Sequence, residues 1–193
     1  MSTATLTEWA YPLAKSLLSE PLPRRWQHSL GVAQRARAIA EILGPDAELL
    51  EAAAVLHDIG YSPDLVKTGF HPLDGARYLR DVANADERVV RLVAHHSCAW
   101  MEAESRGLRE ELEDEFPRQE PHLADALCFC DMNTTPDGTP TNPVDRINEI
   151  AGRYGPDSLI GQFIRRAEPE ILLCTVRVLT RLSDAKAASA QPM

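Results

Sequence analysis

Apolar residues recur along most of the chain at intervals of three and four, the spacing of one face of an α-helix. The first such set runs from Leu6 to Leu17, with Thr5 or Thr3 as its N-cap. No stretch alternates apolar and polar residues as a half-buried strand would, so the pattern predicts an all-α fold. The predicted helices cover residues 6–17, 24–43, 47–57, 87–96, 121–131, 144–154, 159–167 and 171–182, with a short helix opening at 71.

Proline and glycine mark the ends of these helices. Gly44-Pro45 ends the second, and residues 133–143, rich in Thr, Pro, Asn and Gly, form the clearest loop. Pro169 is predicted to begin the last helix, and residues 185–193 to form a frayed tail. The acidic segment 102–120 is interpreted as a solvated face. Because no interdomain linker or repeat is present, residues 1–193 are expected to form one domain.

Composition narrows the class of protein. The 193 residues carry a formal net charge of −9, and no basic run stands out, so polymeric nucleic acid is not an expected partner. The N-terminus lacks the features of a signal peptide, and no apolar run approaches the ~20 residues that span a membrane. We therefore expect a cytoplasmic protein, whose oligomeric state the sequence leaves open.

The four cysteines do not suggest a disulfide framework. Cys128 and Cys130 have one residue between them, whereas a zinc knuckle has two, and positions two apart on a helix point to different faces. Together with Cys98 and Cys174 they are interpreted as buried small hydrophobes rather than metal ligands.

An imidazole stands beside a carboxylate where an apolar segment ends, in Leu56-His57-Asp58-Ile59-Gly60. Neutral histidine and ionised carboxylate are common ligands of a divalent cation. A helix C-terminus, however, also stabilises a histidine without any metal. This segment alone leaves both interpretations open.

The other histidines favour the metal. Five of the six lie at or near a helix terminus, or in a helix that flanks the His57-Asp58 pair, whereas His122 is interpreted as a surface residue. Isolated histidines would each need hydrogen-bond partners of their own, so five such positions point to a shared centre. The five are His28, His57, His71, His95 and His96.

In their order and flanking sequence these residues resemble the HD-domain superfamily of metal-dependent phosphohydrolases. His28, His57-Asp58 and Asp131 follow the order H…HD…D of that family. The segment His71-Pro72-Leu73-Asp74-Gly75-Ala76 is similar to the H-x-x-x-G-A element of its binuclear members, and His95-His96 to their next histidine element. The resemblance implies a compact HD helical bundle with a metal core at about 24–135 and a helical extension at about 143–183.

The resemblance also implies a ligand set. Members with only the shorter motif hold one metal, and members with the extra histidines hold two, bridged by the aspartate of the HD pair. One ion would take His28, His57, Asp58 and Asp131, and the second would share Asp58 and take His71 with His95, His96 or both. A mixed shell of histidine and carboxylate suits Fe, Mn, Co or Zn better than Mg.

Two departures from the family pattern bear on the substrate. Tyr61 stands where many relatives carry a lysine, so contact with phosphate is expected to pass to Lys67 in the loop that follows. Ser97-Cys98-Ala99-Trp100 replaces the Gly-Tyr-Pro signature of the cyclic-dinucleotide phosphodiesterases. The chain is therefore more similar to compact binuclear members that cleave small nucleotides, such as the diadenosine tetraphosphate hydrolases.

Catalysis is assigned to Asp58, Lys67 and Asp74, and substrate binding to Lys67, Tyr61 and Thr134. Each has a structural alternative: packing for Tyr61, an exposed loop position for Lys67, and a helix N-terminus for Asp74.

The leading function is hydrolysis of a small phosphate ester or nucleotide through a metal-activated hydroxide. The ligand set equally suits a di-iron HD-type oxygenase, and a non-catalytic regulatory HD module is the third alternative.

Overall fold

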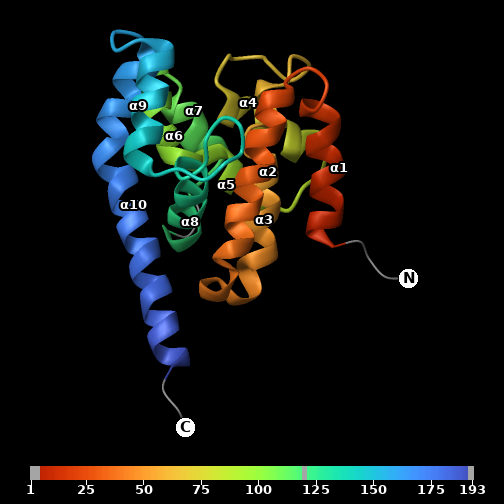
Figure 1. Cartoon of the computed structure of the whole chain (residues 1–193). Helices are drawn as coiled ribbons and strands as arrows, with labels where there is room; N and C mark the ends of the chain where they lie inside the picture. Colours follow the sequence, from red (N-terminus) through yellow and green to blue (C-terminus); the bar gives the residue numbers. More distant parts are fainter. Residues whose placement is uncertain (1–4, 119–120, 191–193) are drawn as a thin grey trace.

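The computed structural model describes residues 5–118 and 121–190, and this part of the chain is helical (Figure 1). Its only pairing of β type is an isolated bridge between Thr134 and Pro140, so the predicted all-α class is confirmed. None of the described helices is both long and apolar enough to cross a membrane. The α-helices are α1 (Leu6–Leu18), α2 (Pro23–Ala38), α3 (Ala47–Leu56), α4 (His71–Asp81), α5 (Glu87–His95), α6 (Ala99–Arg106), α7 (Arg109–Glu115), α8 (Pro121–Met132), α9 (Pro143–Tyr154) and α10 (Leu159–Ser189).

Short 3₁₀ turns adjoin several of these helices. They are η1 (Ala40–Ile42), η2 (Gly44–Asp46), η3 (Ile59–Tyr61) and η4 (His96–Cys98). The predicted helix 24–43 therefore ends early, at Ala38. Other predicted boundaries hold: Thr5 and Glu8 form a capping box at the start of α1, and Asn142 caps α9.

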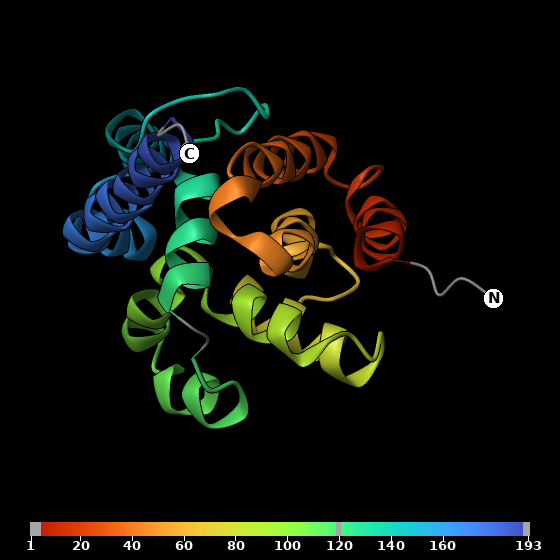
Figure 2. The ribbon, with the colours of Figure 1, turned by 90° about the horizontal axis from the view of Figure 1, so that it is seen from below.

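Helix α3 lies at the centre of the larger apolar core, in contact with α1, α2, α5 and α8 (Figure 2). Every residue from Ala52 to Leu56 is fully buried. The C-terminal half of α3 is apolar on all sides and must be enclosed by other helices, and this enclosure carries the two residues that follow the helix, His57 and Asp58, into the interior.

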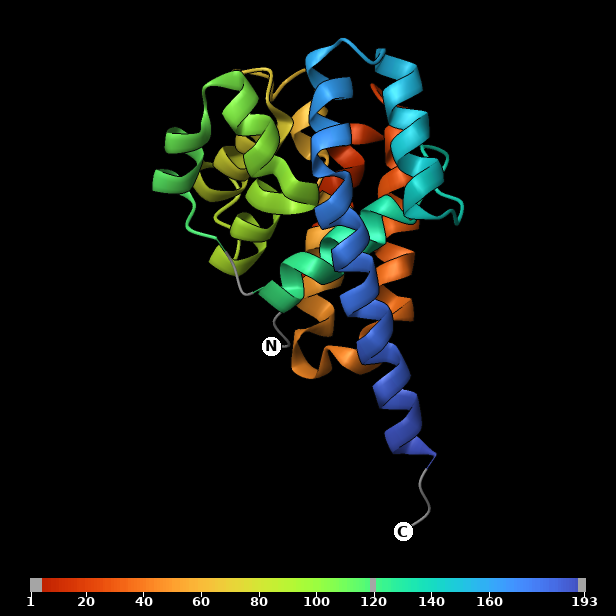
Figure 3. The same cartoon turned by 90° about the vertical axis from the view of Figure 1, so that its left-hand side faces the viewer.

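A second apolar cluster joins the C-terminal helices to α8. Met132 of α8 packs there with Ile147 of α9 and with Phe163, Ile164 and Ile171 of α10. Helix α10 crosses α8, and its C-terminal end extends beyond the rest of the bundle (Figure 3). This cluster places α9 and α10 against the helix that carries Asp131.

Three expectations about the C-terminal half are wrong. Pro169 lies inside the continuous α10 rather than starting a new helix, because buried residues on both sides of it, Ala167 and Ile171, pack into the same cluster. Residues 185–189, expected to be frayed, are helical. The segment 102–118 is not uniformly solvated, since Glu102, Leu112 and Phe116 are buried. Residues 119–120 and 191–193, which the same predictions included, lie outside the described part.

Two close backbone approaches require glycine. A Cβ atom on Gly60 would lie 2.0 Å from the carbonyl oxygen of His71, so the turn after Asp58 presses directly against the start of α4. A Cβ atom on Gly31 of α2 would lie 2.3 Å from the carbonyl oxygen of Gly138, which itself has a positive φ of 81°. The loop 133–142 is thereby held against α2, next to His28.

We expect Gly31→Ala to lower the free energy of unfolding by about 1–3 kcal/mol, because the added methyl group cannot fit without moving the loop backbone. Gly152 on the exposed side of α9 has no neighbour within 4 Å and is the matched control. Gly152→Ala should be neutral or stabilising by about 0.5–1 kcal/mol, since alanine favours the helix. Urea unfolding of both variants measures the difference, and equal stabilities would contradict this account.

Candidate metal centre

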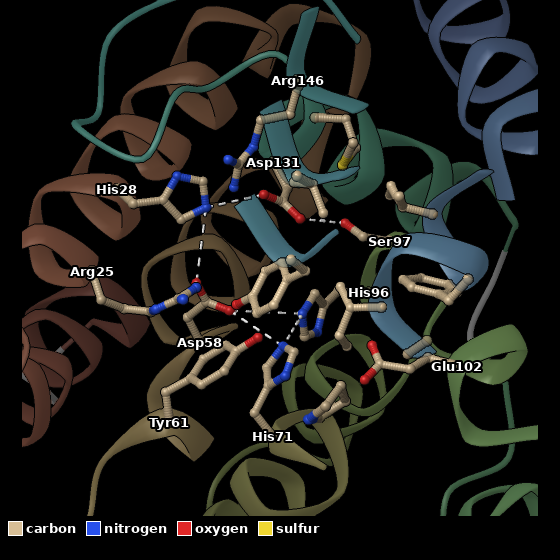
Figure 4. Close-up of a pocket in the computed structure, with 18 of the residues that line it drawn as sticks. Arg25, His28, Asp58, Tyr61, His71, His96, Ser97, Glu102, Asp131 and Arg146 are labelled. Carbon is tan, nitrogen blue, oxygen red and sulfur yellow. Dashed lines mark hydrogen bonds and ion pairs between the residues drawn. The ribbon is translucent and has the colours of Figure 1, made fainter. Parts of the chain in front are cut away.

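Five helical segments bring histidine and aspartate side chains to one buried point (Figure 4). His28 comes from the middle of α2, and His57 and Asp58 follow the last residue of α3. His71 is the first residue of α4, His96 follows α5, and Asp131 is near the end of α8. The His57 ring is completely buried, and the His71 side chain, which lines the cavity, is 13% exposed.

The ring nitrogens and carboxylate oxygens lie within a few ångströms of one another. His28 Nε2 is 3.0 Å from Asp131 Oδ1, and His57 Nε2 is 3.4 Å from Asp58 Oδ2. On the other side, His71 Nε2 is 3.4 Å from Asp58 Oδ1 and 3.1 Å from His96 Nε2. Asp58 therefore faces both halves of the cluster with its two oxygens.

Main-chain carbonyls fix the orientation of three of the rings. His28 Nδ1 is 2.9 Å from Thr135 O, His57 Nδ1 is 2.7 Å from Ala54 O, and His96 Nδ1 is 2.7 Å from Val93 O. A carbonyl only accepts, so each Nδ1 must carry a hydrogen, and Nε2 is the ring nitrogen that faces the centre. Ligating histidines commonly show this arrangement.

His57 gives the most direct sign that the centre suits a cation. Its Nε2 atom is buried and has no hydrogen-bond partner among the described residues. Leaving a buried polar atom unpaired is costly, and here the neighbouring atoms are other lone pairs and carboxylate oxygens. A cation satisfies all of these groups together, so the donor set fits a metal.

The electrostatics favour the metal-binding form of Asp58, His71 and His96, whereas burial would lower the pKa of His57 but Asp58 and Asp131 raise it. Burial would raise the pKa of Asp58, but Arg25 and His57 hold it well below its usual range. Burial, together with the neighbouring His57, lowers the pKa of His96 to about 4, and burial also lowers that of His71. At neutral pH the carboxylate is thus ionised, and these two imidazoles are neutral.

Two overlapping groups of donors are close enough to hold an ion. The ligand atoms of His28, His57 and Asp131 lie within 4.8 Å of one another, and so do those of His57, Asp58 and His96. His71 adjoins the second group through its contacts with Asp58 and His96. Of the seven residues predicted as ligands, six converge here.

His95 is the seventh predicted ligand, and its side chain does not face the centre. Its Nε2 lies 2.5 Å from the carbonyl oxygen of Phe116, and its ring lines a different cavity beside Cys98. The side chains of these consecutive residues diverge because the backbone changes direction here. His95 is the last residue of α5, and His96 has an extended backbone conformation. Of the adjacent pair, only His96 reaches the centre.

Asp74 and Lys67, to which catalysis was assigned from the sequence, do not line the cavity. The Asp74 carboxylate accepts hydrogen bonds from the backbone N–H groups of Lys67, Thr68 and Gly69, so it braces the loop before α4. The Lys67 side chain is exposed and does not line the cavity.

Thr134 does not face the cavity either. Its hydroxyl donates to the carbonyl oxygen of Cys130, 2.7 Å away, and its side chain is buried on another side of the loop. The predicted substrate contact of Thr134 is therefore not supported by its position.

Tyr61 does line the cavity, within a stack of three groups. Its ring lies on the His71 ring with centroids 3.9 Å apart, and the Arg25 guanidinium lies 3.7 Å above the Tyr61 ring. Arg25 also donates to Asp58 Oδ2 at 2.6 Å. Tyr61 thus supports a cation from α2, Arg25, beside Asp58.

Arg146 of α9 is a site residue that the sequence did not indicate. Its side chain is 6% exposed, points into the cavity above Asp131 in Figure 4, and has a buried Nε without a partner among the described residues. It follows the long loop after Asp131, and no spacing relates it to the HD motif. Only the packing of α9 against α8 reveals it.

Ser97 and Glu102 complete the polar lining. The Ser97 hydroxyl donates to Asp131 Oδ2 at 2.5 Å, which holds this carboxylate in position. Glu102 of α6 is buried, and burial raises its pKa although Arg106 pairs with it. The cavity, about 80 Å³, adjoins a second one of about 280 Å³, and Arg25, His28, Arg146 and Arg153 line both.

Sequence comparison relates this chain to two kinds of known protein. A deoxyguanosinetriphosphate triphosphohydrolase-like protein of Corynebacterium diphtheriae is 28% identical over 170 residues, which are 83% of this chain and 34% of that protein. Its counterpart in Corynebacterium efficiens is 31% identical over 158 residues, 76% of this chain and 31% of that protein. Ribonuclease Y of Rubrobacter xylanophilus is 38% identical over 69 residues, 36% of this chain and 13% of that protein.

The chain thus spans about a third of the length of the corynebacterial relatives and less of ribonuclease Y. No solved structure matches it with significance. The profile of the HD domain matches residues 25–133, more than half of the chain and the part that contains every converging histidine and aspartate. This protein is a member of the HD domain family.

Proposed function

We propose that this chain is a metal-dependent phosphohydrolase that cleaves a small phosphate ester or nucleotide. The observation that carries the proposal is the buried, unpartnered Nε2 of His57 within a ring of lone pairs and carboxylate oxygens. Bound divalent cations in such a ring would activate a water molecule and polarise a phosphoryl group. The relatives named as triphosphohydrolase-like agree with this reaction class.

Two ions are proposed, held by six residues. His28, His57, Asp58 and Asp131 would hold the first, and Asp58, His71 and His96 the second. Asp58 can serve both because its two oxygens face opposite halves of the cluster. His95 is left out, since its ring is bonded to Phe116 O.

Arginines, rather than Lys67, are proposed to bind the phosphate. Arg25, Arg146 and Arg153 line the two adjoining cavities, which gives this region cations although the whole chain carries a net charge of −9. A guanidinium suits this role because its fork of N–H donors matches phosphate oxygens. The small cavity and the overall negative charge favour a compact substrate over a long polyanion.

Phosphate release from nucleoside triphosphates, nucleoside monophosphates, dinucleoside polyphosphates and generic esters, each with Mn²⁺, Co²⁺ and Fe²⁺, tests the proposal. A short RNA belongs in the same screen, because some relatives are named ribonuclease Y. If RNA were the only compound cleaved, the substrate would be a nucleic acid and not a small phosphate ester or nucleotide. Oxygen consumption that depends on an added organic compound, with no phosphate released, would favour the di-iron oxygenase instead.

Asp58→Ala should lose most bound metal and all measurable activity, because both proposed ions lose the carboxylate that they share. Metal content after incubation with Mn²⁺, which prefers oxygen and nitrogen donors to thiolates, is the measurement. Asp74→Asn is the matched control, because Asp74 is equally buried but braces a loop. Wild-type metal content in folded Asp58→Ala protein would contradict the assignment.

His71→Ala should lower the Mn²⁺ content from two ions per chain toward one, since four ligands of the first ion remain. His95→Gln should leave the count unchanged, because that ring does not face the centre. A wild-type protein that saturates with one ion, and is indifferent to His71→Ala, would show a mononuclear site.

Arg146→Ala should lower kcat/KM by about 10- to 100-fold, the loss of one charge-assisted contact, with metal content unchanged. Lys67→Ala is the control and should stay close to wild type, because its side chain is exposed and away from the cavity. If Lys67→Ala lowered kcat/KM more than Arg146→Ala, Lys67 rather than Arg146 would be the residue that binds the phosphate.

A further inference from the structure

Three of the four cysteines lie close together in the structure, although no sequence motif relates them. Cys98, Cys128 of α8 and Cys174 of α10 pack in the same small apolar cluster and line the same cavity. The neighbouring thiols of Cys174 and Cys98, together with burial, raise the pKa of Cys128 well above its usual range. All three are buried and free. Cys130 is excluded from this group, because it packs in the larger apolar core on another face of α8.

Carboxylates adjoin these thiols. Cys174 Sγ donates to Asp125 Oδ1 at 3.1 Å, and the donor atoms of Asp125, Glu170 and Cys174 all lie within 4.8 Å of one another. Ligand atoms placed 2.0–2.3 Å from a tetrahedral ion are themselves about 3.3–3.8 Å apart. The 3.1 Å between Cys174 Sγ and Asp125 Oδ1 is close to this spacing, and the Glu170 carboxylate lies within 4.8 Å of both.

The sequence positions also suit a site between two helices. Asp125 and Cys128 are three residues apart on α8, while Glu170 and Cys174 are four apart on α10. These spacings put each pair on one face of its helix, and α8 and α10 pack against each other. Two pairs facing each other across a helix interface resemble the way that helical bundles build metal sites.

A cavity and an unpaired ring nitrogen of His95 give independent support to a cation site. All four of these residues line a cavity of about 510 Å³, together with His95. The His95 ring is 9% exposed, its Nε2 is bonded to Phe116 O, and its Nδ1 has no hydrogen-bond partner among the described residues. The cavity thus offers an approach to the thiols and a further buried lone pair.

Arg177 forms ion pairs with both carboxylates, those of Asp125 and Glu170. Its guanidinium lies 3.1 Å from Asp125 Oδ1 and 2.9 Å from Glu170 Oε1. The side chain is 43% exposed, so it can turn to solvent when another cation arrives. The position already attracts positive charge, and Arg177 would compete with an ion for it.

We infer that Cys128, Cys174, Asp125 and Glu170 form a second cation site, separate from the HD centre, for a thiophilic divalent ion such as Zn²⁺ or Cd²⁺. Thiolates select such ions, and binding would release the two thiol protons to solvent. The ion would tie α8, which carries Asp131, to α10.

Titration of the full-length chain with Cd²⁺ under reducing conditions tests this inference. Thiolate-to-cadmium charge transfer absorbs in the ultraviolet, and the HD centre has no thiolate to produce it. Wild type and Asp58→Ala should both develop the band at one equivalent. Cys128→Ala and Cys174→Ala should lose it, and Cys130→Ala should retain it.

Carboxylate and arginine variants keep the test decisive if a core cysteine variant fails to fold. Asp125→Asn and Glu170→Gln, both partly exposed, should weaken Cd²⁺ binding at least tenfold. Arg177→Gln should tighten it about two- to fivefold, the scale of one exposed ion pair. No charge-transfer band in wild type, a band that survives in folded Cys128→Ala, or unchanged affinity in both carboxylate variants would overturn the inference.

Discussion

The constraint on which this structure depends is the burial of four imidazoles and two carboxylates inside an otherwise apolar bundle. Unpaired, such groups would destabilise the fold, because charge and lone pairs lose their hydration there. Main-chain carbonyls satisfy one side of three rings, and Arg25 pairs with Asp58. The other side of each ring faces the centre, where Nε2 atoms of His71 and His96 approach to 3.1 Å. A bound cation would stabilise all of these groups at once.

The fold meets this constraint by bringing several helix ends to one place. His57, His71, His96 and Asp131 all lie within a few residues of a helix terminus, where the backbone changes direction and adjacent side chains can diverge. The same geometry separates His95 from His96. Close contact between Gly60 and the His71 carbonyl, with no room for a Cβ atom, keeps two of these ends together.

The C-terminal helices do more than extend the family domain. Residues 25–133 match the HD domain and supply the converging histidines and aspartates, whereas Arg146 and Arg153 come from α9, beyond that match. Their position depends on the apolar cluster that joins α8, α9 and α10. The proposed metal chemistry therefore belongs to the family core, and the proposed phosphate contacts depend on how this chain packs its own extension.

The sequence by itself determined the helical class and most helix boundaries, because apolar periodicity and capping residues are local properties. Through the order of the HD motif, it named the six residues that the structure brings together. It also gave Tyr61 but not Arg25 as a leading candidate, since a stack across α2, η3 and α4 has no local pattern. Tertiary structure decided that Asp74 braces a loop, that Lys67 faces solvent and that Pro169 stays within α10. It alone placed Arg146 beside Asp131 and gathered Cys98, Cys128 and Cys174, because contacts between residues distant in sequence arise only from the packing of whole helices.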